Sequence, residues 1–297
     1  MPLAISIAPC SWGVEFAEDP RNPPWTKVLD EAKAAGYTGC ELGPVGFMPE
    51  DPTILGPALA QRGLSLVAGV VFRPFHDPAK WDEVLTASLR TCRALVAHGA
   101  TRIVLIDSIS PLRAPTAGRG SEARRMTGGD LVAFLDRLRT IARMATEEFG
   151  LSASIHAHAG GWVEFEDELE HVLDEIDPKT LGVCLDTGHS IYAGFDPVDF
   201  YLRHAERVTY LHFKDINPTV KARVIQNRIG FYDACAQGLF CVLGKGVVDF
   251  VALRQALESK GYTGWATVEQ DCDPNGPTSP LKDAQSSLKY LKTVELG

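Results

Sequence analysis

Eight short apolar runs, each followed by a longer segment with helical spacing, constrain the fold of this chain most strongly. Runs of this length and composition are typical of strands, and a chain that returns repeatedly from strand through helix to strand makes its strands parallel. Eight such units predict an α/β fold, a single (β/α)8 TIM barrel over residues 1–297. We expect the strands at Ala4–Ala8, Thr38–Leu42, Leu64–Val71, Arg102–Ile106, Ser152–His158, Leu181–Leu185, Val208–Phe213 and Ala266–Glu269.

Capping residues agree with this alternation of strands and helices. Glycine is typical of helix ends, and five glycines lie shortly before expected strands: 36, 63, 99, 150 and 261. Asp-Pro pairs fit helix starts, because the aspartate caps free amides and proline suits the first helical position. They begin at positions 51, 77, 177, 196 and 273. The clearest helical segments are Pro24–Ala35, Asp77–His98, Asp130–Phe149, Glu164–Glu175 and Phe250–Lys260.

Two segments are longer than a bare barrel needs. Ser108–Gly129 follows the fourth expected strand, and Asn217–Gly246 follows the seventh. Both are expected on the face where the carboxyl ends of the strands meet, and long loops there usually shape or cover a site. A subunit contact is an equally weighted interpretation, so a homo-oligomer stays open.

Composition excludes several classes of protein. The net charge of −9 offers no basic face for nucleic acid. Met1-Pro2-Leu3 does not begin a signal peptide, and the apolar run Leu64–Phe72 is too short to cross a membrane. Seven cysteines without a CxxC pair indicate free thiols in a reducing compartment. We therefore expect a cytoplasmic protein that acts on a small molecule, with neither nucleic acid nor membrane as a partner.

Metal-type ligands gather at the ends of the last four expected strands. Residues two apart in a strand face the same side, so His156 and His158 point together, as do His212 and Lys214. The strand ends converge on one mouth in a barrel. Four side chains can therefore meet there: His156, Asp186, His212 and Glu269.

A divalent cation is the simplest reason to bury such a set. Two imidazoles and two carboxylates cost several kcal/mol to bury unless something pairs with them. Direct pairing of histidine with carboxylate is the competing account, and each residue alone is as often a cap or a loop anchor. Mixed nitrogen and oxygen donors suit Mn²⁺, Zn²⁺, Fe²⁺ or Co²⁺ better than Mg²⁺.

Sequence motifs along nearly the whole chain resemble the xylose-isomerase-like superfamily of TIM barrels. The resemblance is strongest to its inosose dehydratase (2-keto-myo-inositol dehydratase) branch. The stretches that carry it are Ala8-Pro-Cys-Ser-Trp12-Gly, Glu41-Leu-Gly-Pro44, His156-Ala-His-Ala-Gly160, Asp186-Thr-Gly-His189, His212-Phe-Lys-Asp215, Leu243-Gly-Lys-Gly246 with Asp249-Phe250, and Gly264-Trp-Ala-Thr-Val-Glu-Gln-Asp271. The resemblance implies one bound divalent metal, with Mn²⁺ preferred, on His156, Asp186, His212 and Glu269.

One departure from the superfamily pattern bears on the reaction. Many epimerases and isomerases of the superfamily have glutamate where this chain has His156. Epimerisation usually needs two bases, whereas dehydration of a β-hydroxy ketone needs one base and one acid. The histidine therefore favours a metal-dependent lyase that dehydrates a keto-inositol or a related keto-polyol, although His158 is available as a second base.

The hypothesis gives further residues roles. His158 or Glu269 removes the α-proton, and Lys214 or His189 assists the departing hydroxyl. Trp12 supplies an apolar face to the substrate, with barrel packing as an equal alternative. Glu41 and Arg73 hold sugar hydroxyls or simply pair with surface charges, and Arg223 is a further candidate for substrate binding.

Several rival functions use the same fold. A sugar or sugar-phosphate isomerase or epimerase is kept open by basic residues suited to phosphate: Arg119, Arg124, Arg125, Arg223 and Arg228. A 3-keto-glycoside lyase would use the same proton abstraction with another leaving group. A repair nuclease is disfavoured by the acidic balance and by only eight histidines. Nothing in the sequence favours a non-enzymatic binding module.

Overall fold

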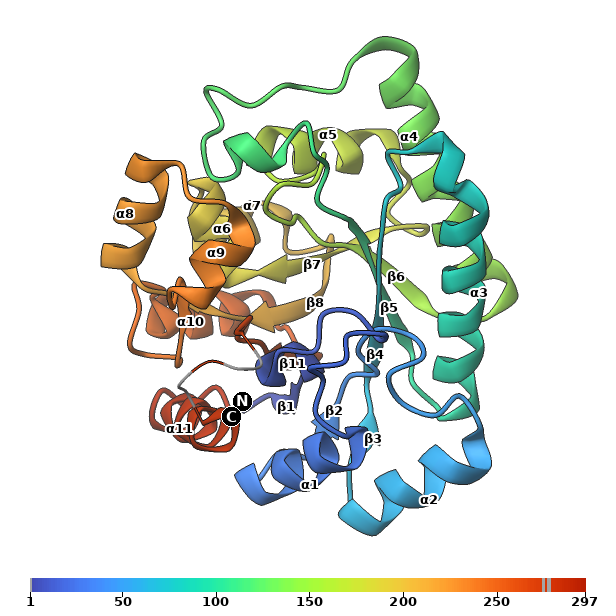
Figure 1. The fold of residues 1–297 in the computed structure, drawn as a ribbon, viewed down its shortest axis with the longest axis vertical. Coiled ribbons are helices and arrows are strands. Elements are labelled where there is room, and N and C mark those ends of the chain that lie inside the picture. Colours follow the sequence, from blue (N-terminus) through green and yellow to red (C-terminus); the bar gives the residue numbers. More distant parts are fainter. Residues whose placement is uncertain (1, 274–275, 277–278) are drawn as a thin grey trace.

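Parallel strands form the centre of the molecule (Figure 1). The structure is a computed structural model that describes residues 2–273, 276 and 279–297. Its larger sheet has the order β3-β2-β1-β11-β8-β7-β6-β5-β4. The bounds are β1 Ala4–Ile7, β2 Gly39–Cys40, β3 Ser65–Leu66, β4 Ala68–Arg73, β5 Arg102–Asp107, β6 Ser152–Ile155, β7 Gly182–Asp186, β8 Val208–Phe213 and β11 Trp265–Val268.

The third strand closes the barrel. β3 pairs with β2 and β4 pairs with β5, and only Val67 separates β3 from β4. The expected strand Leu64–Val71 is thus one stave with a break at Val67, and it joins the two edges of the sheet. With β3 and β4 counted together, eight parallel staves surround the axis, which confirms the predicted TIM barrel.

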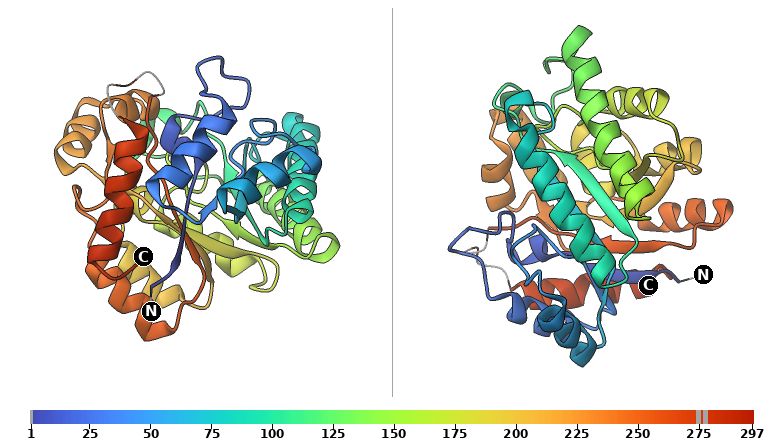
Figure 2. Two further views of the ribbon diagram at one scale, coloured as in Figure 1. Left: turned by 90° about the horizontal axis from the view of Figure 1, so that it is seen from below. Right: turned by 90° about the vertical axis from the view of Figure 1, so that its right-hand side faces the viewer.

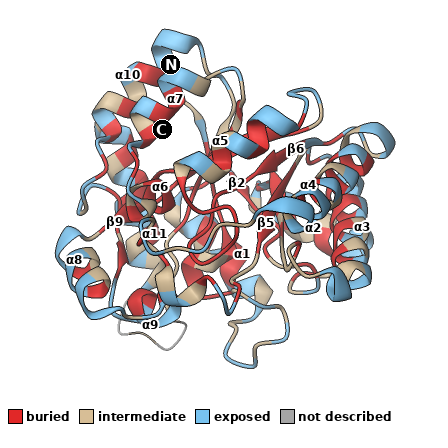
Figure 3. Ribbon diagram, turned by 90° about the horizontal axis from the view of Figure 1, so that it is seen from above, coloured by how far each residue is buried: buried red, intermediate tan, exposed pale blue. Residues whose placement is uncertain are grey.

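Helices cover the outside of the barrel (Figures 2 and 3), with their buried faces turned toward the strands. A large apolar core lies between sheet and helices, and a smaller cluster that includes Val104, Cys184 and Tyr210 lies beside it. The α-helices are α1 Trp25–Ala35, α2 Pro52–Arg62, α3 Trp81–Ala97, α4 Gly128–Arg143, α5 Glu166–Glu175, α6 Thr187–Ala193, α7 Pro197–His204, α8 Pro218–Asn227, α9 Phe231–Ala236, α10 Phe250–Lys260 and α11 Pro280–Thr293.

The expected Asp-Pro caps behave in three ways. Asp51 and Asp196 cap α2 and α7, and Asp77 caps a short 3-10 helix before α3. Asp177 starts a turn in which the Thr180 amide donates to its carbonyl oxygen at 2.8 Å, so no helix begins there. The pair at 273 and 274 lies partly outside the described residues.

The segment 217–246 folds into a small unit of its own. It contains α8, α9 and β10 (Phe240–Cys241), which pairs antiparallel with β9 (Asp215–Ile216). Its apolar side chains form a separate core with neighbours such as Ala117, Ala159 and Tyr192. Below, residues 217–246 are called the cover.

Asp215 fixes the end of the cover to the barrel. Its carboxylate accepts the amides of Gly244 and Gly246 at 2.9 Å and that of Val248 at 3.1 Å. A Cβ on Gly246 would lie 2.1 Å from Asp215 Oδ1, so only glycine permits this approach. The glycines of the Leu243–Gly246 motif therefore serve a loop anchor.

Both ends of the described chain lie together on the face opposite the strand mouths (Figure 2). The Leu3 amide donates to the Leu296 carbonyl oxygen at 2.9 Å, and β1 pairs with β11 beside them. All seven cysteines are free thiols, as expected. Among the described residues, none of the helices is long and apolar enough to cross a membrane.

Candidate active site

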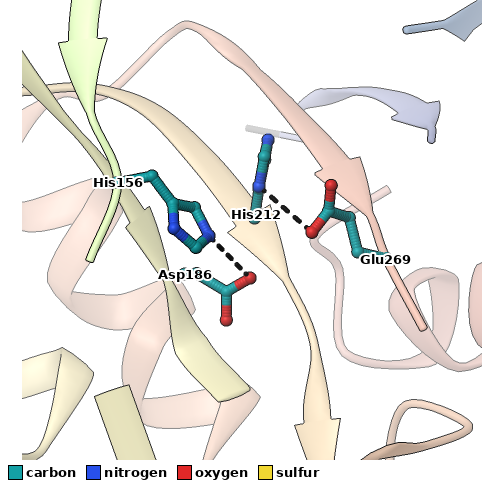
Figure 4. A group of neighbouring side chains, drawn as sticks. All are labelled: His156, Asp186, His212 and Glu269. Carbon is teal, nitrogen blue, oxygen red and sulfur yellow. Dashed lines mark hydrogen bonds and ion pairs between the residues drawn. The ribbon is translucent and has the colours of Figure 1, made fainter. Parts of the chain in front are cut away.

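Four buried side chains meet at the mouth of the barrel (Figure 4). One ligand atom from each lies within 4.8 Å of the corresponding atoms of the others. They come from four neighbouring staves, and they are the four predicted ligands: His156, Asp186, His212 and Glu269.

The first pair is held by β6 and β7. His156 follows β6 directly, and its amide still donates to the Leu105 carbonyl oxygen at 3.0 Å, so the ladder fixes its backbone. Asp186 ends β7 and caps α6, with Oδ1 accepting the His189 amide at 2.7 Å. Its other oxygen, Oδ2, lies 3.3 Å from His156 Nε2. Asp186 is therefore both a helix cap and a member of the cluster.

The second pair is held by β8 and β11. His212 is paired with Thr267 in the register of these strands, and the Glu269 amide donates to the Phe213 carbonyl oxygen at 3.0 Å. His212 Nδ1 then lies 3.2 Å from Glu269 Oε2.

The donor set fits a transition-metal cation. Nδ1 of His156 and Nδ1 of His212 are buried without a hydrogen-bond partner among the described residues. Buried polar nitrogens without partners are rare in proteins and call for an explanation. Two imidazoles and two carboxylates are also the mixture that Mn²⁺, Zn²⁺, Fe²⁺ and Co²⁺ accept.

Lys214 lies among the carboxylates of the site. Its Nζ is 3.3 Å from Asp186 Oδ2, 3.0 Å from Glu269 Oε2 and 2.9 Å from Asp271 Oδ2. Burial alone would lower the pKa of Lys214, but these three carboxylates raise it well above its usual value. One ammonium cannot balance three carboxylates, so negative charge remains that a divalent cation would compensate.

The same charges keep the carboxylates ionised. Burial would raise the pKa of Glu269, but His212 and Lys214 lower it to about 2. For Asp186, burial is likewise outweighed by Lys214 and His189, which hold its pKa well below the usual range. Ionised carboxylates are the form that binds metals.

His158 has the properties of a general base. Its Nδ1 lies 3.0 Å from the Ala159 carbonyl oxygen, which can only accept, so Nδ1 carries the proton and Nε2 the lone pair. Burial lowers the pKa of His158 well below its usual value, and the nearby rings of His189 and His156 lower it further. The imidazole is therefore neutral near pH 7 and able to accept a proton.

His189 lies behind His158. Its Nδ1 accepts the Ala159 amide at 3.3 Å, which places its proton on Nε2, 3.7 Å from Asp271 Oδ2. Its ring lies 4.3 Å from that of His158 and 5.6 Å from that of Phe231. Of the two predicted proton donors, Lys214 lines a cavity beside the cluster. His189 does not line that cavity but packs against His158, which does.

A cavity adjoins these groups and has two parts. The inner part, about 70 Å³, is lined by the cluster members His156 and Glu269, by His158 and Lys214, and by apolar residues such as Phe72. The outer part, about 400 Å³, runs beneath α9. Cys10, Glu15 and Asp271 line both parts.

The residues predicted to bind substrate lie in different places. Arg73 lines the inner cavity, where it also approaches Glu83 at 3.6 Å. Glu41 lines it too, but its carboxylate is fully buried and contacts His212. The ring of Trp12 packs into the core, and its Nε1 donates to Glu31 at 2.6 Å. Arg223 is exposed on α8. The structure thus brings Arg73 and Glu41 to the cavity and leaves Trp12 and Arg223 outside its lining.

The structure adds residues that we did not assign from the sequence. Asp271 binds Lys214, and Glu15 and Tyr232 line the outer cavity with 3.5 Å between their side-chain oxygens. Phe231 packs its ring 5.1 Å from that of His158. Asp271 was visible two residues beyond Glu269. Phe231 and Tyr232 depend on how the cover folds back, and Glu15 depends on the loop that precedes α1; the sequence carries no local signal for either.

The family follows from comparison with known proteins. The family model described as xylose isomerase-like TIM barrel matches residues 29–294. The chain belongs to this family. The resemblance seen in its motifs is confirmed.

Curated relatives match nearly the full length. The inosose dehydratase of Geobacillus kaustophilus is 30% identical over 303 residues, covering 98% of this chain and 94% of that protein. The rhizopine catabolism protein MocC of Rhizobium meliloti is 31% identical over 300 residues, covering 98% and 88%.

Solved structures show the same fold at low identity. The IolI protein with a bound zinc atom has a TM-score of 0.75 and 13% identity, covering 99% of this chain and 98% of that one. The probable 3-DHS dehydratase AsbF of Bacillus anthracis has a TM-score of 0.72 and 15% identity, covering 98% and 99%. The zinc belongs to the IolI structure; in this chain, the four-residue cluster is a group that could hold a metal ion.

Proposed function

We propose that the protein is an inosose dehydratase-like lyase, which dehydrates a keto-inositol or a related keto-polyol with one divalent metal. One observation carries the proposal. A neutral histidine with a free lone pair, His158, and a buried ammonium, Lys214, line the same small cavity as two members of the four-ligand cluster, His156 and Glu269. These are the base and the acid that an elimination needs.

The comparisons with known proteins bear on the class of enzyme. Curated relatives at about 30% identity over nearly the whole chain are named inosose dehydratase, which confirms the prediction of an enzyme of the dehydratase class. The substrate, the metal and the roles of individual residues belong to the proposal.

The base in this proposal is His158. Its Nε2 removes the proton on the carbon next to the ketone, which leaves electron density on the ketone oxygen. His158 suits this step better than Glu269, because the Glu269 carboxylate is already paired with His212 and Lys214 within the cluster. The bound metal would polarise the ketone and stabilise the negative charge on its oxygen.

The acid in this proposal is Lys214. As the carbon–oxygen bond of the β-hydroxyl breaks, Nζ gives a proton to the departing oxygen, which leaves as water. The contact between Lys214 and Asp271 holds the ammonium at the cavity wall. Arg73 lies where it can bind a further hydroxyl.

Mn²⁺ is the proposed ion, with Co²⁺, Zn²⁺ and Fe²⁺ as alternatives. The partner is a small polyol or ketose rather than nucleic acid or membrane, and a cytoplasmic location and a homo-oligomeric state remain predictions. Isomerisation or epimerisation of a sugar or sugar phosphate and 3-keto-glycoside cleavage are the rival reactions on the same cluster.

A substrate panel tests the proposal. Purified protein is analysed for bound metals and then offered keto-inositols, ketoses, sugar phosphates, 3-keto-glycosides and abasic DNA. The proposal expects a dione product, detected by its ultraviolet absorbance, from the keto-inositol alone. Turnover of a sugar phosphate or a keto-glycoside without dehydration of any keto-inositol would refute the substrate class.

A further inference from the structure

Glu41 lies on the far side of His212 from the metal cluster. His212 Nε2 is 3.0 Å from Glu41 Oε1, whereas His212 Nδ1 faces Glu269 Oε2 at 3.2 Å. The two ring nitrogens therefore point at carboxylates that belong to different parts of the site. Glu41 is fully buried, and so is His212.

A second contact fixes the carboxylate itself. The Tyr210 hydroxyl donates to Glu41 Oε1 at 2.7 Å, and the same hydroxyl is hydrogen-bonded to Thr267. Thr267 in turn contacts the Ser6 hydroxyl at 2.5 Å. This chain of polar groups crosses the barrel interior from β8 through β11 to β1, and it holds Oε1 in line with His212.

We propose that Glu41 is a positioning residue for the metal ligand His212, not a group that binds substrate hydroxyls. Both ring nitrogens face a carboxylate, which can only accept, so a cation bound at Nδ1 would leave the one remaining ring proton on Nε2, donated to Glu41. The lone pair is then on Nδ1, directed into the cluster. Partners of this kind orient a ligating histidine and raise its basicity.

The inference rests on the proposed metal site. It adds to that site a residue, Glu41, that is not one of the four ligands. It also gives a role to Nδ1 of His212, which among the described residues forms an ion pair with Glu269 Oε2 at 3.2 Å but no hydrogen bond. Without Glu41 the ring would be free to place its proton on Nδ1, which would close that position to a cation.

Metal affinity tests the inference directly. Glu41→Ala and Glu41→Gln are titrated with Mn²⁺ and Co²⁺ by calorimetry alongside the unchanged protein. We expect the dissociation constant to rise roughly 10- to 100-fold in Glu41→Ala, and by less in Glu41→Gln, whose amide oxygen still accepts. Tyr210→Phe, which removes one contact to Oε1, should weaken binding by roughly fivefold.

A matched control separates positioning from general damage. Asp107 is another buried carboxylate at a strand end, where it accepts the amides of His76 at 3.0 Å and Trp162 at 2.9 Å, and it is not in the cluster. Asp107→Asn should leave metal affinity unchanged. In metal-free protein, at a pH where the His212 ring is neutral, nitrogen NMR should report a larger share of the Nε2-protonated tautomer in the unchanged protein than in Glu41→Ala.

The outcomes distinguish this inference from the proposed function. If the unchanged protein binds one ion and both Glu41 variants bind it equally tightly while KM rises, Glu41 binds substrate and the inference is overturned. If the Glu41 variants lose affinity, the inference stands whichever substrate proves correct. A protein that binds no ion would overturn the metal site and this inference together, whereas a wrong substrate alone would leave affinity data intact.

Discussion

The floor and the roof of the cavity are built in different ways. The floor consists of residues at or just beyond the ends of β6, β7, β8 and β11, where ladder hydrogen bonds fix each backbone. The roof is the cover, two short helices and a two-residue strand with an apolar core of its own. The residues proposed to bind metal, whose distances must be fixed, belong to the floor. In the roof, Phe231 packs against His158, and Tyr232 lines the outer cavity.

This difference suggests a division of labour. Strand ends in a closed barrel cannot shift without breaking several hydrogen bonds, which suits a metal cluster. A small separate core opens at lower free energy than the main one, which suits a region that substrates must pass. Substitutions in the floor should therefore abolish turnover, whereas substitutions in the roof should change access.

Removing a floor ligand should have the largest effect. His212→Ala and Glu269→Ala each remove one of four donors, so bound metal should be lost and kcat/KM should fall at least ~10²-fold, since a metal supplies several kcal/mol of charge stabilisation. Elemental analysis and steady-state kinetics measure the two effects. Full metal stoichiometry in both variants would contradict the assigned cluster.

Removing the base should stop turnover without releasing the metal. His158→Gln keeps a polar side chain but no basic nitrogen, so kcat should fall roughly 10²- to 10⁴-fold. Bound metal should stay at the level of the unchanged protein. A variant that loses metal instead would show that His158, and not His156, is a ligand.

Shrinking a roof side chain should change access more than chemistry. Phe231 is buried against His158 and Phe240, so Phe231→Ala leaves a void in the cover. We expect KM to rise by about tenfold, and amide exchange to accelerate within 218–241 but not in β7 or β8. Equal acceleration in the strands would show that roof and floor form one cooperative unit.

The opening between roof and floor should respond to pH. Burial, with Asp271 nearby, raises the pKa of Glu15 to about 8, so this carboxyl is neutral at pH 7. Because the folded pKa is above the unfolded one, ionisation costs stability between about pH 4.5 and 8. Relative to Glu15→Gln, the unchanged protein should therefore lose stability progressively across that window. Denaturant unfolding at several pH values measures the difference, and parallel curves for both proteins would contradict the raised pKa.

The smallest expected effect comes from removing one helix cap in the roof and one in the barrel, which compares the two regions with the same kind of change. Asn217 caps α8 of the roof, accepting the Thr219 amide at 3.0 Å, and Asp196 caps α7 of the barrel, accepting the Val198 amide at 2.7 Å. Each change to alanine should cost about 1 kcal/mol locally. The free energy of global unfolding should fall by the full local cost in Asp196→Ala and by only part of it in Asn217→Ala. Identical shifts in Tm would argue against a separately opening roof.

The floor could be predicted from the sequence much better than the roof. Strand ends with His, Asp and Glu are local signals, and parallel topology then brings them together, so the cluster could be predicted before the structure. The roof was marked only as an unusually long segment, because its fold depends on Phe231 and Phe240 meeting partners far along the chain. For a similar reason, the sequence left alternatives open for Trp12 and Glu41. Residue type showed chemistry, but only packing showed that one joins the core and the other contacts His212.

The hydrogen bond between Leu3 and Leu296 holds the two ends of the described chain next to each other. A short linker across that junction, with new termini cut into an exposed loop between helix and strand, should give a circularly permuted protein with an unaltered mouth. The same geometry leaves both ends of the described chain on the side away from the four-residue cluster, so domains fused there would not cover the mouth of the barrel.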